Sequence, residues 1–130
     1  MPSTSRLGLV LTLLALSVVG APPAKADGSC TAGKYCLWLD SNFSGCKYEF
    51  DRFEPDLRNS YFTDCPQQSV NDQVSSFDNT TGRFLLMWSE PNYKGKLLCV
   101  TQHQRANVPL DMNDKISSIR AYAFRQPGCN

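Results

Sequence analysis

The sequence predicts an all-β fold, built as an antiparallel sandwich or barrel. Three observations support this prediction. Short runs rich in β-branched and aromatic residues alternate with clusters of turn-forming residues, which is typical of such folds. No long stretch free of helix breakers carries apolar residues at the spacing of an amphipathic helix. Two motifs also occur twice in the same order, which indicates a duplicated half-domain.

The first 26 residues have the three parts of a secretory signal peptide. A positive charge at Arg6 precedes the mostly apolar run Leu7–Val19, and the segment ends in Ala24-Lys25-Ala26. The run is shorter than the roughly 18 apolar residues that a membrane span needs. We therefore predict a secreted, extracellular protein with a signal peptide at 1–26 and one domain at 27–130.

The composition of residues 27–130 excludes several kinds of partner and site. This part holds 11 Lys and Arg against 12 Asp and Glu, with no basic block. Such a chain is a poor ligand for nucleic acid or an anionic membrane, so we predict neither partner. The one histidine, His103, excludes any site that needs two imidazoles.

All six cysteines lie after the predicted signal peptide. They are Cys30, Cys36, Cys46, Cys65, Cys99 and Cys129. An even number in an exported chain indicates up to three disulfides, with about 15 possible pairings, and the count leaves the pairing open. Metal-binding thiolates are the less favoured alternative outside the cell.

Five strands and one helical turn are expected along the chain. The strands are Lys34–Leu39, Cys46–Phe53, Arg83–Ser89, Lys96–Thr101 and Ser117–Phe124. Turn-forming clusters lie between them at Asp40–Asn42, Asp78–Gly82, Glu90–Asn92 and Asp111–Asp114. Asp56–Tyr61 has room for one turn of helix.

The first repeated motif is aromatic-x4-aromatic-x-Gly. It occurs as Trp38, Phe43 and Gly45, and again, 50 residues later, as Trp88, Tyr93 and Gly95. We interpret each copy as a folded hairpin in which the aromatic rings pack across the bend. The glycine then takes a backbone conformation that other residues resist.

The second repeated motif follows each hairpin. Asn71–Ser76 reads N-D-Q-V-S-S, and Asn113–Ser118 reads N-D-K-I-S-S. The order is therefore hairpin, loop, hairpin, loop. It predicts two copies of a half-domain, at about 34–78 and 83–125.

This order of motifs resembles the βγ-crystallin superfamily, over roughly residues 35–124. The resemblance implies two intercalated Greek keys that form a β-sandwich. The opening Cys30–Trp38 is similar to the C-x-x-G-x-x-C-L-W start of secreted actinobacterial proteins in peptidase inhibitor family I36. The type member of that family inhibits thermolysin-like metalloproteinases. With this likeness, the C-x5-C spacing suggests a local Cys30–Cys36 bridge.

The paired loops are candidate Ca²⁺ sites, because each offers an amide, a carboxylate and two hydroxyls within six residues. The candidate loop residues are Asn71, Asp72, Gln73 and Ser75, then Asn113, Asp114, Lys115 and Ser117. By resemblance, the ligands include the carbonyls of Gln73 and Lys115, the hydroxyls of Ser75 and Ser117, and hairpin carbonyls at Leu39 and Ser89.

Up to two ions are expected, with weak affinity on the order of 10⁻⁵ to 10⁻³ M because few ligands are charged. Lys115 departs from an ideal site, since its charge opposes the ion unless its side chain points away. In the alternative reading, each loop is an Asx-turn followed by a hydroxyl-capped corner, and neither loop binds a metal.

The resemblance also implies inhibition of a secreted metalloproteinase. The resembled inhibitor presents a Cys-Val bond after a Lys-x-x run, and Lys96–Val100 contains such a run before Cys99 and Val100. No second cysteine lies near Cys99 to rigidify the segment, and an ordinary bridged strand is the alternative interpretation.

An enzyme is not expected. His103 follows Cys99 by four residues, but an exported chain oxidises its cysteines and leaves no thiolate nucleophile. The other function we consider is a monomeric structural, stress or toxin-like module that binds calcium and has no protease target.

Overall fold

The computed structural model describes residues 28–129. The predicted signal peptide lies outside these residues. Within the described part, no helix has both the length and the apolar character needed to cross a membrane.

Ten strands and one short 3-10 helix make up the described chain. In order they are β1 (Tyr35–Asp40), β2 (Ser44–Phe50), β3 (Phe53–Glu54), η1 (Leu57–Asn59), β4 (Tyr61–Phe62), β5 (Cys65–Ser69), β6 (Ser76–Asn79), β7 (Phe84–Glu90), β8 (Lys94–Val100), β9 (Arg105–Asn107) and β10 (Ser118–Tyr122).

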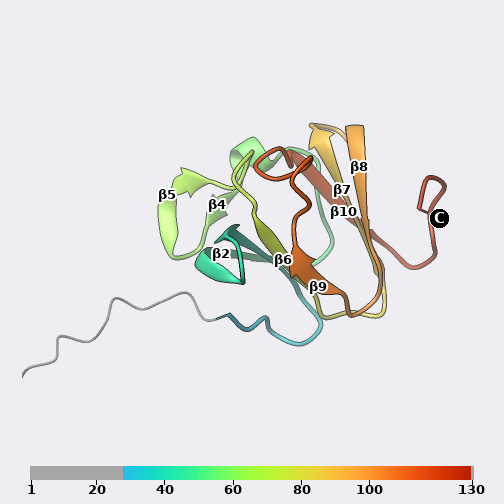
Figure 1. Ribbon diagram of the computed structural model, residues 1–130, viewed down its shortest axis with the longest axis horizontal. Helices are drawn as coiled ribbons and strands as arrows, with labels where there is room; N and C mark the ends of the chain where they lie inside the picture. The colour runs from blue at the N-terminus through green and yellow to red at the C-terminus, as the bar shows by residue number, and fades with distance from the viewer. Residues whose placement is uncertain (1–27, 130) are drawn as a thin grey trace, which may run out of the picture.

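The strands form two four-stranded antiparallel sheets that pack face to face (Figure 1). The strand order is β2-β1-β6-β9 in the first sheet and β3-β10-β7-β8 in the second. β9 belongs to the second repeat but completes the first sheet, and β3 belongs to the first repeat but completes the second. The fold is therefore the predicted β-sandwich of two intercalated Greek keys. A separate β4–β5 hairpin projects from one side.

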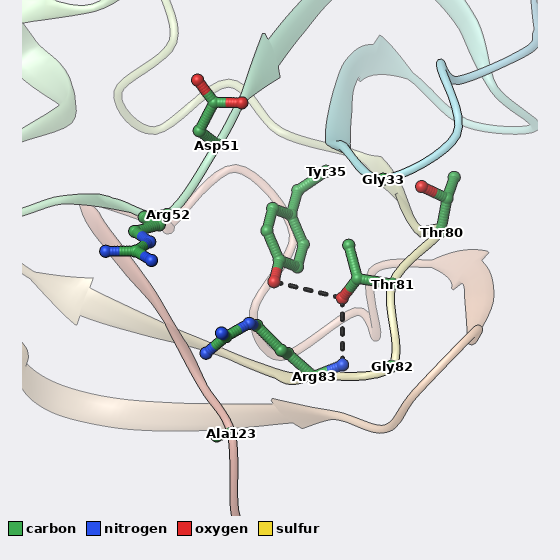
Figure 2. Close-up of a pocket in the computed structure, with 9 residues that line it drawn as sticks. All are labelled: Gly33, Tyr35, Asp51, Arg52, Thr80, Thr81, Gly82, Arg83 and Ala123. Carbon is green, nitrogen blue, oxygen red and sulfur yellow. Dashed lines mark hydrogen bonds between the residues drawn. The ribbon is translucent and has the colours of Figure 1, made fainter.

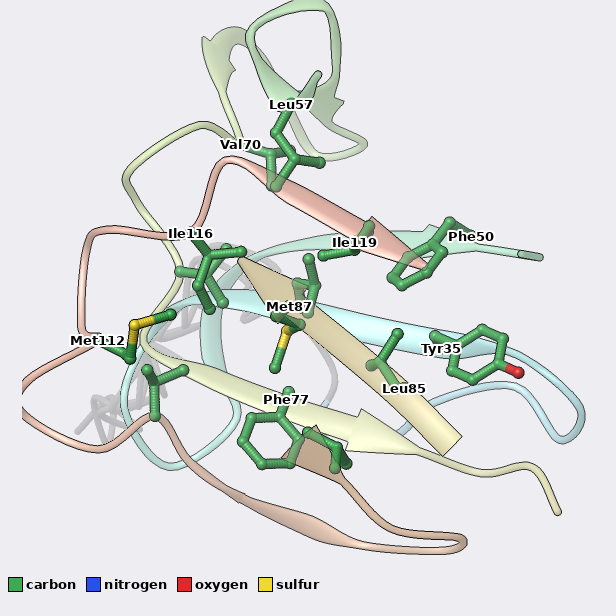
Figure 3. Packing of buried hydrophobic residues seen from close by; sticks show 14 of the residues in the cluster. Tyr35, Phe50, Leu57, Val70, Phe77, Leu85, Met87, Met112, Ile116 and Ile119 are labelled. Carbon is green, nitrogen blue, oxygen red and sulfur yellow. The ribbon is translucent and has the colours of Figure 1, made fainter. Parts of the chain in front are cut away.

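The main core fills the space between the two sheets (Figure 3). Leu85 and Met87 of β7 and Ile119 of β10 face Tyr35 of β1 and Phe77 of β6, and all five are at most 2% exposed. Leu85 and Met87 are two residues apart along β7, which is the spacing of side chains on one face of a strand. The opposite face of β7 is also covered, since Phe84 and Leu86 pack with Cys129 in a second, smaller cluster.

The five predicted strands all form, with shifted ends and one break. The run expected at Cys46–Phe53 is divided, because β2 ends at Phe50 and β3 begins at Phe53 in the other sheet. The expected helical turn forms as η1, where the Asp56 side chain accepts the Arg58 backbone N–H. The chain thus changes sheet where the sequence showed one continuous β-rich run.

The turn was predicted to begin at Asp78, but β6 continues through Asn79, so the observed turn begins later. Asn79 is fully buried, and its amide donates to the carbonyls of Arg83 at 2.7 Å and Thr101 at 3.0 Å. These bonds offset the cost of burying a polar side chain in a strand. The sequence prediction also omitted β4, β5, β6 and β9, which are short.

Three disulfides tie the sandwich together. The expected Cys30–Cys36 bridge is present, and the other two join Cys46 to Cys65 and Cys99 to Cys129. The second anchors the β4–β5 hairpin to β2, and the third holds the C-terminal turn against β8. No cysteine in the described part of the chain remains free.

Candidate functional site

Both repeated hairpins fold as their motif predicts. The rings of Trp38 and Phe43 meet edge to face at 5.4 Å, and those of Trp88 and Tyr93 meet at 5.2 Å. Phe43 and Tyr93 have φ angles of 57° and 62°, which is uncommon for a bulky side chain. The two hairpins are therefore matched in backbone conformation as well as in sequence.

Each hairpin is closed by the second serine of the following loop, a role that we did not assign from the sequence. The Ser76 hydroxyl donates to the Asp40 carbonyl at 2.7 Å and accepts the Phe43 N–H at 3.1 Å. Ser118 does the same to Glu90 and Tyr93, at 2.6 and 3.0 Å. The available signal was the order of the motifs, since an N-D-x-x-S-S loop follows the hairpin in both repeats, although 33 residues separate Phe43 from Ser76 and 25 separate Tyr93 from Ser118.

The two N-D-x-x-S-S loops lie against each other and exchange backbone hydrogen bonds. The Asp72 N–H donates to the Ile116 carbonyl at 3.0 Å, and the Asp114 N–H donates to the Val74 carbonyl at 3.2 Å. Asp72 and Asp114 both have left-handed backbones, with φ of 57° and 58°. This conformation is tolerated by aspartate, and it turns each carboxylate toward the opposite loop.

The result is a reciprocal serine–aspartate pair. The Ser75 hydroxyl lies 3.3 Å from Asp114 Oδ1, and the Ser117 hydroxyl lies 3.1 Å from Asp72 Oδ1. Ser75 and Ser117 are themselves 7% and 4% exposed. Each half of the site therefore takes its hydroxyl from one repeat and its carboxylate from the other, which the sequence alone did not indicate.

The donor set of these loops suits a hard cation such as Ca²⁺, which binds oxygen ligands. Asn71 Oδ1 is buried and has no hydrogen-bond partner among residues 28–129. The ladders of both hairpins shift register between Trp38 and Asp40 and between Trp88 and Glu90, at the positions of Leu39 and Ser89.

The other predicted ligands within the two loops are Gln73, Asn113 and Lys115. Lys115 is exposed, whereas Gln73 and Asn113 are partly buried. The Asn113 N–H donates to the Pro109 carbonyl at 2.9 Å, which fixes the start of the second loop.

The predicted reactive bond between Cys99 and Val100 lies at the end of β8, the edge strand of the second sheet. Val100 is fully buried in the main core and pairs with Leu85 of β7. Cys99 is bridged to Cys129, so the rigidifying bond that the sequence left unassigned comes from the C-terminal turn. A protease would have to reach a bond whose following side chain is buried.

The Cys99–His103 pair considered as a nucleophile and base has no thiol. Cys99 is in a disulfide, and His103 is exposed in the turn after β8. This pair therefore offers no thiolate, since an oxidised sulfur is no nucleophile.

Comparison with solved structures returns βγ-crystallin domains. A structure from work on the evolution of the eye-lens βγ-crystallin domain fold has a TM-score of 0.62 at 20% identity, covering 76% of this chain and 94% of that one. A βγ-crystallin domain from Clostridium beijerinckii has a TM-score of 0.58 at 21% identity, covering 70% and 99%. A βγ-crystallin from Ciona intestinalis has a TM-score of 0.56 at 25% identity, covering 69% and 100%.

Comparison of the sequence with curated proteins gives no significant match. The model of one protein family, by contrast, matches residues 23–100, from before the first disulfide to the end of β8. That family is described as peptidase inhibitor family I36, and the match covers more than half of the chain. The chain therefore belongs to peptidase inhibitor family I36, and it has a βγ-crystallin fold.

Proposed function

We propose that this protein is a secreted, monomeric inhibitor-type module whose paired loops bind up to two Ca²⁺ ions. The observation that carries the calcium proposal is the reciprocal pair, in which Ser75 faces Asp114 and Ser117 faces Asp72. Two carboxylates drawn toward hydroxyls of the opposite repeat suit a cation that needs six to eight oxygens. The unpartnered Asn71 Oδ1 beside them supports the same reading.

Calcium would add a link between the two repeats. Each ion would be held by groups from both loops, so binding would stabilise the folded state over the unfolded chain. An ion present at 100 times its dissociation constant contributes about 2.7 kcal/mol per site. We therefore expect a higher melting temperature in millimolar Ca²⁺ than in chelator.

Calorimetric titration of the mature protein with Ca²⁺, combined with thermal unfolding, tests the proposal. Asp72→Asn and Asp114→Asn should each remove one binding event. Asp111→Asn is the matched control, because it changes the same charge near the second loop but is engaged by Lys96 instead. No heat and no change in melting temperature at 10 mM Ca²⁺ would end the calcium proposal.

The second part of the proposal is that the chain inhibits a thermolysin-like metalloproteinase. Membership of family I36 supports a protease as the partner in general. Whether the Cys99–Val100 bond is the reactive bond is a separate prediction, and the complete burial of Val100 weighs against it.

Inhibition is measured with a thermolysin-like protease and a chromogenic peptide. Val100→Ala truncates the side chain after the predicted bond, and Val70→Ala, an equally buried valine, is the matched control. If the bond is reactive, only Val100→Ala should raise the inhibition constant, by roughly tenfold for the lost methyl groups. Equal effects of both variants would remove the bond from the proposal, and no inhibition at micromolar protein would leave a calcium-binding module without a protease target.

A further inference from the structure

An open pocket lies on the side of the sandwich where β1, β6 and β7 have their adjoining ends (Figure 2). It has a volume of about 560 Å³ and is lined by Arg52 and Arg83 together with small and hydroxyl-bearing residues. A smaller pocket of about 240 Å³ adjoins it, since Arg52 and Arg83 also line that pocket, together with Arg120. The two arginines therefore form the wall that the pockets share.

The two guanidinium groups of this wall carry uncompensated charge. Within residues 28–129, neither Arg52 nor Arg83 forms an ion pair, and neither side chain donates a hydrogen bond. The one carboxylate that lines the larger pocket, Asp51, is paired with Lys34. Figure 2 shows that carboxylate turned away from both arginines, whose guanidinium groups extend toward the same side of the opening.

Both arginines rise from backbone that is fixed. The Arg83 N–H donates to the Thr81 hydroxyl at 3.1 Å, and that hydroxyl donates in turn to Asn79 Oδ1 at 2.7 Å. The hydroxyl of the buried Tyr35 lies 3.1 Å from Thr81 Oγ1 and completes this polar floor. At the other arginine, the Arg52 carbonyl accepts the Ala121 N–H at 2.8 Å.

The rim of the pocket is open because two of its residues are glycines. A side chain added at Gly33 or Gly82 would meet no atom within 4 Å. Gly33 has a φ of 83°, whereas Gly82 has a φ outside the left-handed region, so only Gly82 accepts a side chain without backbone strain. Gly82, which lines the pocket, is therefore the position at which a larger side chain narrows the rim without disturbing the fold.

We propose that this pocket binds a tetrahedral oxyanion, the phosphate or sulfate group of a small extracellular ligand. Arginine presents planar forks that bind phosphate oxygens through two parallel hydrogen bonds. Two such forks on one wall, without a carboxylate between them, match a group that carries several oxygens and up to two charges. The proposal is independent of calcium binding and of protease inhibition, because the serine–aspartate loops contribute no residue to either pocket.

The test follows backbone and arginine N–H signals by NMR while the mature protein is titrated with inorganic phosphate at constant ionic strength. Sulfate, glycerol 3-phosphate and acetate form parallel arms that separate a free ion, an ester and a carboxylate. We expect shifts centred on Gly33, Gly82 and the two arginines. Arg52→Gln and Arg83→Gln should each weaken phosphate binding about tenfold or more, and Gly82→Leu should abolish it.

Lys94→Gln is the matched control, because it removes one exposed positive charge from β8, outside both pockets. It should leave the phosphate midpoint unchanged, and unchanged melting temperatures verify that the variants fold. Equal midpoints in the arginine variants and the control would overturn the proposal, as would shifts spread evenly over all basic residues. Acetate binding as tight as phosphate would overturn the assignment to a tetrahedral oxyanion.

Discussion

Trp38 and Trp88 occupy the same position of the duplicated hairpin but differ in burial, so their removal should have unequal costs. Trp38 is fully buried, whereas Trp88 is partly exposed. The first hairpin is covered more closely, because the guanidinium of Arg105 of β9 lies 3.7 Å from the centre of the Phe43 ring and 5.8 Å from that of Trp38, whereas Arg120 lies 5.6 Å from the Tyr93 ring. Arg105 also bonds to the Gly28 carbonyl, so the N-terminal segment covers the first hairpin.

The magnitude follows from the area that each ring removes from water. A buried aromatic side chain contributes about 150 to 250 Å², which at about 25 cal/mol per Å² corresponds to about 4 to 6 kcal/mol. Measured costs of replacing a buried tryptophan with alanine are about 3 to 5 kcal/mol. The ring–ring contact is present in both hairpins and cancels in the comparison. We therefore expect Trp38→Ala to cost about 4 kcal/mol and Trp88→Ala about half of that.

Urea unfolding with the disulfides intact, followed by circular dichroism, measures both costs as differences in the free energy of unfolding. Trp38→Phe serves where Trp38→Ala does not fold, with an expected cost of about 1 to 2 kcal/mol. A cost for Trp38→Ala equal to or below that for Trp88→Ala would refute the reasoning. In that case the cover over the first hairpin would add nothing to its stability.

Three further predictions concern a serine that closes a hairpin, two glycines and one carboxyl group. Ser76→Ala should cost about 1 to 3 kcal/mol in urea unfolding, because it leaves the Asp40 carbonyl and the Phe43 N–H without their partner, and an unchanged midpoint would contradict this. Gly45→Ala should cost at least about 1 to 2 kcal/mol in the same urea assay, since Gly45 has a φ of 77° and a Cβ there would lie 2.4 Å from Asp40 Oδ2. Gly82→Ala should be near neutral, because a Cβ there would meet no atom within 4 Å. Burial raises the pKa of Asp78, with Arg105 opposing the shift, so the folded protein retains a proton there that the unfolded chain has already released. The stability that Asp78 contributes is therefore present at low pH and lost as the pH rises through its folded pKa. Relative to Asp78→Asn, the native protein should be more stable at pH 3 than at pH 7, and a difference that does not vary with pH would contradict the assignment.

The sequence determined the fold class and the local motifs, namely the two hairpins and the two N-D-x-x-S-S loops. The β-rich run at Arg83–Ser89 predicted a strand, and Leu85 and Met87 share one face of it because side chains alternate along a strand, whatever lies opposite. The duplicated hairpins were readable because an aromatic pair and a glycine at fixed spacing act within a few residues. The Cys30–Cys36 bridge was readable for the same reason, since its loop is short.

Elements that depend on distant partners were not readable. β6 continues through Asn79 only because its amide reaches the carbonyls of Arg83 and Thr101. The division of Cys46–Phe53 between two sheets depends on β10, which lies at the far end of the chain and pairs with β3. The Cys99–Cys129 bridge likewise joins segments that only the folded sheet brings together.

The candidate site shows the same division. The sequence alone identified Asp72 and Asp114, with Ser75 and Ser117, as candidate oxygen ligands. Carboxylates and hydroxyls are chemically suited to a hard cation wherever they lie. Only the tertiary structure decided which carboxylate faces which hydroxyl, since the intercalation of the two Greek keys sets each loop against the other repeat. The burial of Val100 was decided in the same way, because a residue at the end of an edge strand is exposed or buried according to the sheet that packs over it. Residue chemistry is local and is written in the sequence, whereas burial and pairing depend on contacts between segments that are far apart along the chain.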